Sequence, residues 1–273
     1  MDITIRQTRV WLWLTIPIAI LLFISAGGGI FLGNLYRDNP SFTAQAIGQD
    51  IVSFWVVLPL LVVTAILAGR GSPHAQIIWF GGLIYIIYTY VVAAFDVKFN
   101  PLFLAYVALL GCSIYALILG LISADLERIK SYFTQKTPVN AVSIYLIVLA
   151  VLFYFLWLSE IVPALLAGRV PQSIQENGTP TNAVHVLDMA WILPAFIITA
   201  VSLRRKQALG YTLAGALLSY TVLLILAILG MVVEMVREGV PIVIPQVVIF
   251  GALLVISLGM FIWYMKGLES PSI

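Results

Sequence analysis

Long apolar runs alternate with short polar breaks along the whole chain. Each run holds about 20 residues, which is the length that an α-helix needs to cross the hydrocarbon core of a bilayer. The breaks carry charged residues, glycine and proline, as in Arg70-Gly71-Ser72-Pro73, and such residues favour turns. The pattern predicts an all-α polytopic bundle of eight transmembrane helices, at residues 10–32, 51–68, 77–95, 101–122, 142–167, 184–203, 209–233 and 243–265.

The composition agrees with a protein that lies in lipid. The 273 residues are 62% hydrophobic and only 10% charged, whereas about 25% of the residues of an average soluble domain are charged. A net charge of +2 and the lack of a basic run with aromatic residues exclude a nucleic-acid partner. The single cysteine, Cys112, excludes a disulfide or zinc framework. We expect one integral membrane domain over residues 1–273, in contact with the bilayer.

The first apolar run resembles a signal peptide, because Arg6 and Arg9 precede it. It is longer than the apolar part of a signal peptide, so we interpret it as a retained span. Basic residues are retained in cytoplasmic loops. With the N-terminus inside, ten basic residues lie on the inner side and four on the outer side. We therefore predict that both termini are cytoplasmic. The lone cysteine and the short loops favour a bacterial cytoplasmic membrane.

The chain also carries signs of an internal repeat. A shift of 135 positions brings Leu58-Pro59 onto Leu193-Pro194 and Arg70 onto Arg205. Apolar helices also match by chance, but the agreement of proline, arginine and loop positions favours two four-helix repeats, at residues 10–122 and 142–267. An even number of spans per repeat implies a pseudo-twofold axis along the membrane normal, with any binding site at the interface of the repeats.

The strongest chemical signal lies at the start of the sixth span. His185 and Asp188 are three positions apart, so they share one face of a helix. A charged group at membrane depth is unfavourable by at least ~2.5 kcal/mol, so such residues usually face the interior and a partner. Asp188 lies ~6 Å and Glu160 ~10 Å below the outer surface, from the rise per residue. We predict that Glu160, His185 and Asp188 meet.

Further residues are candidates for the same outward-facing pocket. Asp50 falls opposite His185 in the repeat, and Gln246 and Tyr106 lie at similar depth. Pro59 and Pro194 predict kinks that widen a cavity, because proline frees a backbone carbonyl. Three tryptophans line the pocket or belong to an interfacial belt, namely Trp55, Trp157 and Trp191. Tyr85 and Tyr88 line a pathway or pack with their hydroxyls bonded to the next helix.

Carboxylates and an imidazole can hold a divalent metal, bind a cationic substrate or relay a proton. They can also form a structural ion pair without further chemistry. The metal therefore stays open, and we expect no cofactor. Only two histidines are present, so a multi-histidine zinc enzyme and a bis-histidine haem protein are both disfavoured.

Three classes of function remain. The first is a protein that binds or transports a small solute or cation, which the repeat, the prolines and the intramembrane acids favour. The second is a structural or assembly subunit of a membrane complex or homo-oligomer, which the lack of extramembrane domains suits. The third is an intramembrane enzyme that uses Glu160, His185 and Asp188, although the sequence carries no recognisable nucleophile arrangement.

Overall fold

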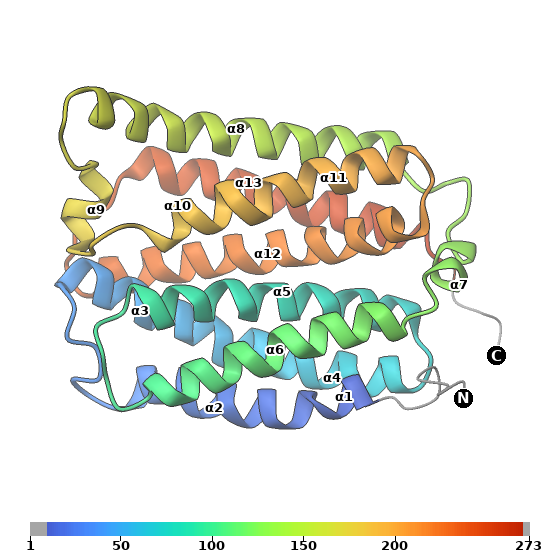
Figure 1. The fold of residues 1–273 in the computed structure, drawn as a ribbon, viewed down its shortest axis with the longest axis horizontal. Coiled ribbons are helices and arrows are strands. Elements are labelled where there is room, and N and C mark those ends of the chain that lie inside the picture. The colour runs from blue at the N-terminus through green and yellow to red at the C-terminus, as the bar shows by residue number, and fades with distance from the viewer. Residues whose placement is uncertain (1–9, 270–273) are drawn as a thin grey trace.

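A computed structural model describes residues 10–269 of the chain, and Arg6 and Arg9 lie outside the described residues. Within that range, eight helices are long and apolar enough to cross a membrane. They run roughly side by side, and short connections join them at the two ends of the bundle (Figure 1). The predicted all-α bundle of eight apolar helices is therefore confirmed. The chain order of the helical elements is α1(Val10–Trp13), α2(Thr15–Phe31), α3(Pro40–Val52), η2(Ser53–Val57), α4(Leu58–Gly69), α5(Pro73–Phe95), α6(Phe103–Ser123), α7(Leu126–Ser131), α8(Val139–Leu166), α9(Gln172–Asn177), α10(Ala183–Leu187), η3(Asp188–Ile192), α11(Leu193–Arg204), α12(Ala208–Arg237) and α13(Ile244–Met265).

The second span begins much earlier than its predicted start at residue 51. Its first helix, α3, begins at Pro40, because Asn39 accepts a hydrogen bond from the Phe42 N–H and proline is favoured in the first turn. The segment between Pro40 and Asp50 is rich in polar residues, so its hydropathy did not predict a membrane helix. Some of these polar side chains face the interior of the bundle, since Gln49 and Asp50 are buried.

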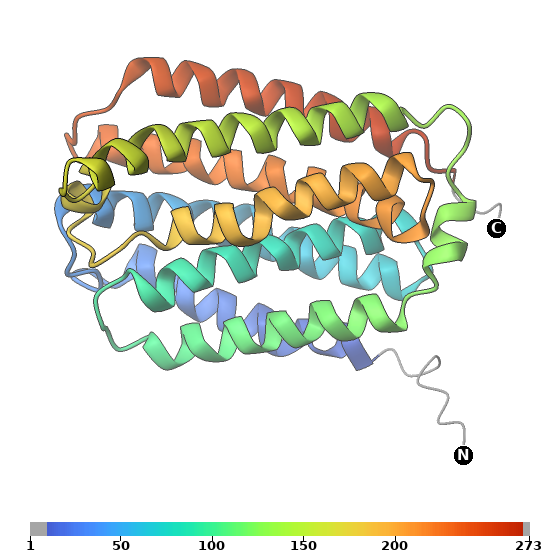
Figure 2. The same cartoon turned by 45° about the horizontal axis from the view of Figure 1, so that its top comes forward.

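Two helices, α5 and α12, occupy the middle of the bundle (Figures 1 and 2). The helix α5 packs against α4 and α6, and α12 packs against α11 and α13. Each of the two also contacts the start of a span from the other half of the chain, since α12 lies against α3 and α5 lies against α10. The helices α8 and α13 lie on one side of this pair, and α2 and α6 lie on the other.

Small residues allow the central helices to approach closely. A Cβ atom added at Gly81 of α5 would lie 2.6 Å from the carbonyl oxygen of Ala216 of α12. A Cβ atom at Gly230 of α12 would lie 2.8 Å from the carbonyl oxygen of Gly48 of α3. Helices in lipid associate through such close van der Waals contacts, because the bilayer supplies no hydrophobic driving force between them.

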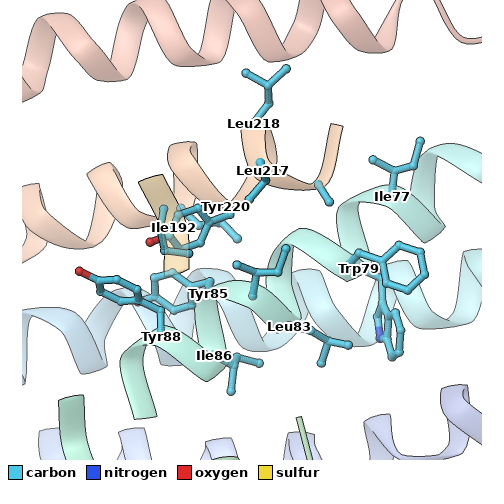
Figure 3. Packing of buried hydrophobic residues seen from close by; sticks show 14 of the residues in the cluster. Ile77, Trp79, Leu83, Tyr85, Ile86, Tyr88, Ile192, Leu217, Leu218 and Tyr220 are labelled. Atoms are coloured by element: carbon cyan, nitrogen blue, oxygen red, sulfur yellow. The ribbon is translucent and has the colours of Figure 1, made fainter. Parts of the chain in front are cut away.

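The core beside these contacts is largely aromatic. Tyr88 of α5 and Tyr220 of α12 lie between these two helices, and Trp79 and Tyr85 of α5 belong to the same core together with branched aliphatic side chains (Figure 3). The rings of Tyr88 and Tyr220 lie 5.8 Å apart. The indole N–H of Trp79 donates to the Thr15 hydroxyl of α2 at 3.0 Å. Aromatic rings thus fill the core and also connect neighbouring spans by hydrogen bonds.

The elements of the two halves match when the chain is shifted by 135 positions. The π-helical segment η2 (Ser53–Val57) falls on η3 (Asp188–Ile192), and α4 (Leu58–Gly69) falls on α11 (Leu193–Arg204). The helix α5 begins at Pro73 and α12 begins at Ala208. The loop residues Gly71 and Lys206 both have a positive φ, at 93° and 56°.

The first described helix begins and the last one ends at the same end of the bundle, here called the terminal end. The connections at the opposite end are residues 32–39, 96–102, 167–182 and 238–243. Basic residues are unevenly divided between the two ends of the described chain. The terminal end carries Arg70, Arg128, Lys130, Lys136, Arg204, Arg205, Lys206 and Lys266, and the opposite end carries Arg37, Lys98, Arg169 and Arg237.

We expect Gly81→Val to lower the stability of the folded protein by ~1–3 kcal/mol, because its side chain would enter the contact with the Ala216 backbone. Gly111→Val in α6 is the matched control, since a Cβ atom there meets no atom within 4 Å and the change in helix propensity is the same. Thermal unfolding in detergent measures both. Equal unfolding temperatures for the two variants would contradict the importance of the α5–α12 contact.

Candidate functional site

The sixth span starts with a short helix, α10, whose first backbone N–H groups are held by side chains. The Asn182 side chain accepts from the N–H groups of Val184 and His185, at 3.0 and 3.3 Å. The Asp96 carboxylate, which follows α5, accepts from the Ala183 N–H at 2.8 Å. Burial raises the pKa of Asp96, and the Ala183 hydrogen bond opposes that shift by stabilising the ionised form. This double cap fixes the backbone that carries His185.

A π-helical segment follows directly, where the sequence predicts a kink at Pro194. The Leu193 N–H donates to the Asp188 carbonyl, five residues back, and the Leu58 N–H donates to the Ser53 carbonyl in the same way. Pro59 and Pro194 each stand one residue later. Because proline lacks an N–H and its ring excludes the carbonyl four residues before it, one wider turn relieves the conflict. Asp188 and Ser53 are the first residues of these two segments.

Asp188 is buried between three spans and accepts two hydrogen bonds from neutral donors. The Tyr88 hydroxyl of α5 donates to one carboxylate oxygen at 3.0 Å. The Trp157 indole N–H of α8 donates to the other oxygen at 2.8 Å. Both donors satisfy the oxygens as acceptors, but neither carries a positive charge. Asp188 therefore keeps its capacity to hold a proton or a cation.

Glu160 and His185 form a second pair next to Asp188. The Glu160 carboxylate lies 3.8 Å from the His185 Nε2 atom, which is beyond hydrogen-bond distance. Its other oxygen accepts from the Ser173 N–H in α9 at 2.8 Å. The His185 side chain is buried and its Nε2 has no hydrogen-bond partner, whereas a quarter of the Glu160 side chain is exposed. The Trp157 ring lies against His185, with the ring centroids 4.6 Å apart.

A small cavity adjoins the buried side of Asp188. Its volume is about 30 Å³, and Tyr220 and Thr221 of α12 line it together with apolar side chains of α8, η3 and α11. The Tyr220 hydroxyl is buried without a hydrogen-bond partner. The lining is mainly apolar, and the volume is sufficient for a water molecule.

The other predicted site residues lie elsewhere. The Asp50 carboxylate accepts a hydrogen bond from the Tyr36 hydroxyl, and Tyr106 is buried with its ring 5.8 Å from that of Tyr90. Gln246 is exposed in the first turn of α13. The structure therefore places Glu160 near His185 and connects the side chains of His185 and Asp188 only through Trp157, whereas Asp50 and Tyr106 lie in another part of the bundle.

The sequence did not assign hydrogen-bond donors to the buried aspartates, although it named Trp157 for the pocket and Tyr88 for a pathway. Tyr88 and Tyr36 each donate to a buried aspartate, and Trp157 is a hydrogen-bond donor as well as a ring. The sequence left Tyr85 and Tyr88 open between a pathway and hydrogen-bonded packing. The structure shows the latter, since the Tyr85 hydroxyl lies 3.0 Å from that of Ser53. A hydrogen bond between a buried acid and a tyrosine on different helices cannot be recognised from a single sequence.

The donor groups limit the chemistry. Among residues 10–269, the histidine, cysteine, aspartate and glutamate side chains form no group of three that could hold a metal ion. In the same range, no serine or cysteine side chain is hydrogen-bonded to Glu160, His185 or Asp188. Glu160, His185 and Asp188 therefore offer two carboxylates and one imidazole, with no serine hydroxyl or cysteine thiol hydrogen-bonded to them among the described residues.

Eight apolar helices with buried acids between them define an integral, multi-pass membrane protein of the all-α class. Comparisons of the chain with protein-family models, with curated proteins and with solved structures give no match.

We expect Trp157→Phe to destabilise the protein by ~1–3 kcal/mol, because it removes one donor from the buried Asp188 carboxylate. Trp55→Phe makes the same chemical change on a side chain that is 64% exposed and serves as the control. Thermal unfolding in detergent compares the two variants. If both unfold at the wild-type temperature, the indole contributes ring packing and no important hydrogen bond.

Proposed function

We propose that the protein binds a proton or a small cation between Glu160, His185 and Asp188, at the end of the bundle that lies opposite the terminal end. The observation that carries this proposal is the gap of 3.8 Å between the Glu160 carboxylate and the buried, unpartnered Nε2 of His185. The gap between the two side chains is too long for a direct hydrogen bond. A bridging water or an ion can fill it, and a proton on His185 would attract the Glu160 carboxylate toward the ring. The partly exposed Glu160 gives the pair access to the surface.

The three groups form a path from the surface toward the interior. Glu160 is reached first, His185 is next, and Asp188 lies beyond the Trp157 side chain, which contacts both His185 and Asp188. Intramembrane acids of this kind mark ion pathways and proton relays in membrane proteins. The cavity of about 30 Å³ beside Asp188 provides space for water or an ion at the inner end of the path.

The size of the cavity narrows the class of ligand. A space of about 30 Å³ favours a proton or a single small ion over an organic cation. A metal centre has less support, because the described residues offer no group of three metal-binding side chains. A transport role for such a cation is part of the proposal, and the path from Glu160 to Asp188 is its entry segment.

We further propose that the terminal end is cytoplasmic and that the site opens to the outer side. The excess of basic residues in the connections at the terminal end supports this orientation. Two four-helix repeats, related by a pseudo-twofold axis along the membrane normal, fit the matching bounds of η2 with η3 and of α4 with α11. Gly81 and Ala216 are equivalent in this register and contact each other, as expected for positions next to such an axis.

The test is thermal unfolding of the purified protein in detergent, with sodium, potassium or choline chloride and between pH 5 and 8. We expect one small cation, or the proton, to raise the unfolding temperature of the wild type. A ligand at 100 times its dissociation constant adds about 2.7 kcal/mol to the stability of the native state. Glu160→Gln and Asp188→Asn should lose this response and keep their fold.

Glu176→Gln is the control for this experiment, because Glu176 also lies at the opposite end but is exposed, with Gln172 as its side-chain partner. It should keep the wild-type response. If the wild type responds to no cation and to no change of pH, and Asp188→Asn is strongly destabilised, the cluster is a structural contact. That outcome would favour an assembly subunit of a membrane complex.

A further inference from the structure

The first half of the chain holds a second buried acid, away from the site of Glu160, His185 and Asp188. Asp50 lies in the last turn of α3 and is only 6% exposed. The Tyr36 hydroxyl, from the loop that follows α2, donates a hydrogen bond to one of its carboxylate oxygens. This pair joins the end of the first span to the second span.

The backbone of the first span leaves room for this pair at a single glycine. A Cβ atom added at Gly29 of α2 would overlap the Asp50 carboxylate and would lie 2.8 Å from the Tyr36 hydroxyl. Any other residue at position 29 would displace the acid or the phenol. The carboxylate therefore rests directly on the backbone of α2.

Unpartnered hydroxyl groups surround the pair. The side-chain oxygens of Ser25, Tyr90 and Tyr106 are buried, and none has a hydrogen-bond partner. These side chains are 0%, 1% and 2% exposed. The rings of Tyr90 and Tyr106 lie 5.8 Å apart, and Ser25 stands about one helical turn before Gly29, against which the Asp50 carboxylate rests. Such buried, unpartnered oxygens in one place call for a water or an ion between them.

Within residues 10–269, no cationic side chain forms an ion pair with Asp50. The ion pairs of residues 10–269 are Lys130–Glu127, His185–Glu160 and Arg237–Glu234, and none involves Asp50. The groups that face Asp50 from the surrounding helices are the phenols of Tyr36, Tyr85, Tyr90 and Tyr106, which are neutral. An unpaired carboxylate at this depth is strongly unfavourable, so its charge must be balanced.

We propose that Asp50, Tyr36, Tyr90, Tyr106 and Ser25 form an occluded binding site for one sodium ion. One carboxylate balances the single charge of Na⁺, whereas a divalent ion would leave an excess positive charge in the membrane. Carboxylate and hydroxyl oxygens are the ligands that hard cations prefer. A proton on Asp50 would also balance the charge, and a stability that depends on pH but not on Na⁺ would reveal it.

This site does not depend on the function proposed above. It is built by α2, α3, α5 and α6, whereas the site of Glu160, His185 and Asp188 is built by α8, α10 and η3. The two sites share no side chain. Variants can therefore test them separately, and one can fail without the other.

The experiment is equilibrium binding of radioactive ²²Na⁺ to the purified full-length protein in detergent, with choline chloride keeping the ionic strength constant. The wild type should bind about one Na⁺ per chain. Asp50→Asn should abolish binding. Tyr106→Phe removes one oxygen and should weaken binding about tenfold, which corresponds to ~1.4 kcal/mol.

Tyr115→Phe is the matched control, because Tyr115 lies on the same helix as Tyr106 but is 64% exposed, and it should bind Na⁺ as the wild type does. Glu160→Gln should also bind normally. If Asp50→Asn fails to fold, Tyr106→Phe decides, since it removes only one oxygen. Absence of Na⁺ binding by the wild type, or a stability that responds to pH but not to Na⁺, would overturn the sodium assignment.

Discussion

The close contact between α5 and α12 is the constraint on which the rest of the bundle depends. Gly81 and Ala216 let the two backbones approach without a side chain between them. In lipid, apolar surface gains nothing by leaving the solvent for another helix, so close packing and hydrogen bonds must hold the spans together. The contact fixes where Tyr85, Tyr88 and Tyr220 lie, and these residues then determine where the buried acids find their partners.

The two buried aspartates follow the same physical rule. Asp188 accepts from a phenol and an indole, and Asp50 accepts from a phenol, so the hydrogen bonds to both carboxylates come from neutral donors. This contrasts with Glu234 near the end of α12, which lies 3.4 Å from the guanidinium of Arg237. A carboxylate next to an arginine has its charge balanced within the protein. A carboxylate next to neutral donors stays available for a proton or a cation, and this difference separates the candidate sites from an ordinary ion pair.

The sequence was sufficient for the eight spans because length and hydropathy are local properties of the chain. It failed at the start of α3, where Ser41, Gln45 and Gln49 look like a loop, although Asn39 and Pro40 carry the signals of a helix start. Contacts between different spans could not be predicted. His185 and Asp188 were recognisable by their spacing, but the roles of Tyr36, Tyr88 and Trp157 depend on contacts between residues that are 14 to 100 positions apart in the chain.

The repeat register that we propose also explains why the two halves carry different chemistry. In that register Asp50 corresponds to His185, and Ser53 corresponds to Asp188. The acid therefore stands about one helical turn deeper in the second half than in the first, directly at the π-helical segment. At this depth it reaches Tyr88 of the opposite half, whereas Asp50 stays among residues of its own half.

In the proposed register, Asp188 stands three residues later than the position that corresponds to Asp50. The two aspartates therefore contact different parts of the bundle. Asp188 lies where α5 and the second half meet, so a change in its charge acts on the contact between the halves. Asp50 accepts from Tyr36 of its own half and lies on the backbone of α2, although its helix α3 also packs against α12 of the second half. The hydrogen bond that joins a buried aspartate to the opposite half is therefore made by Asp188 and not by Asp50.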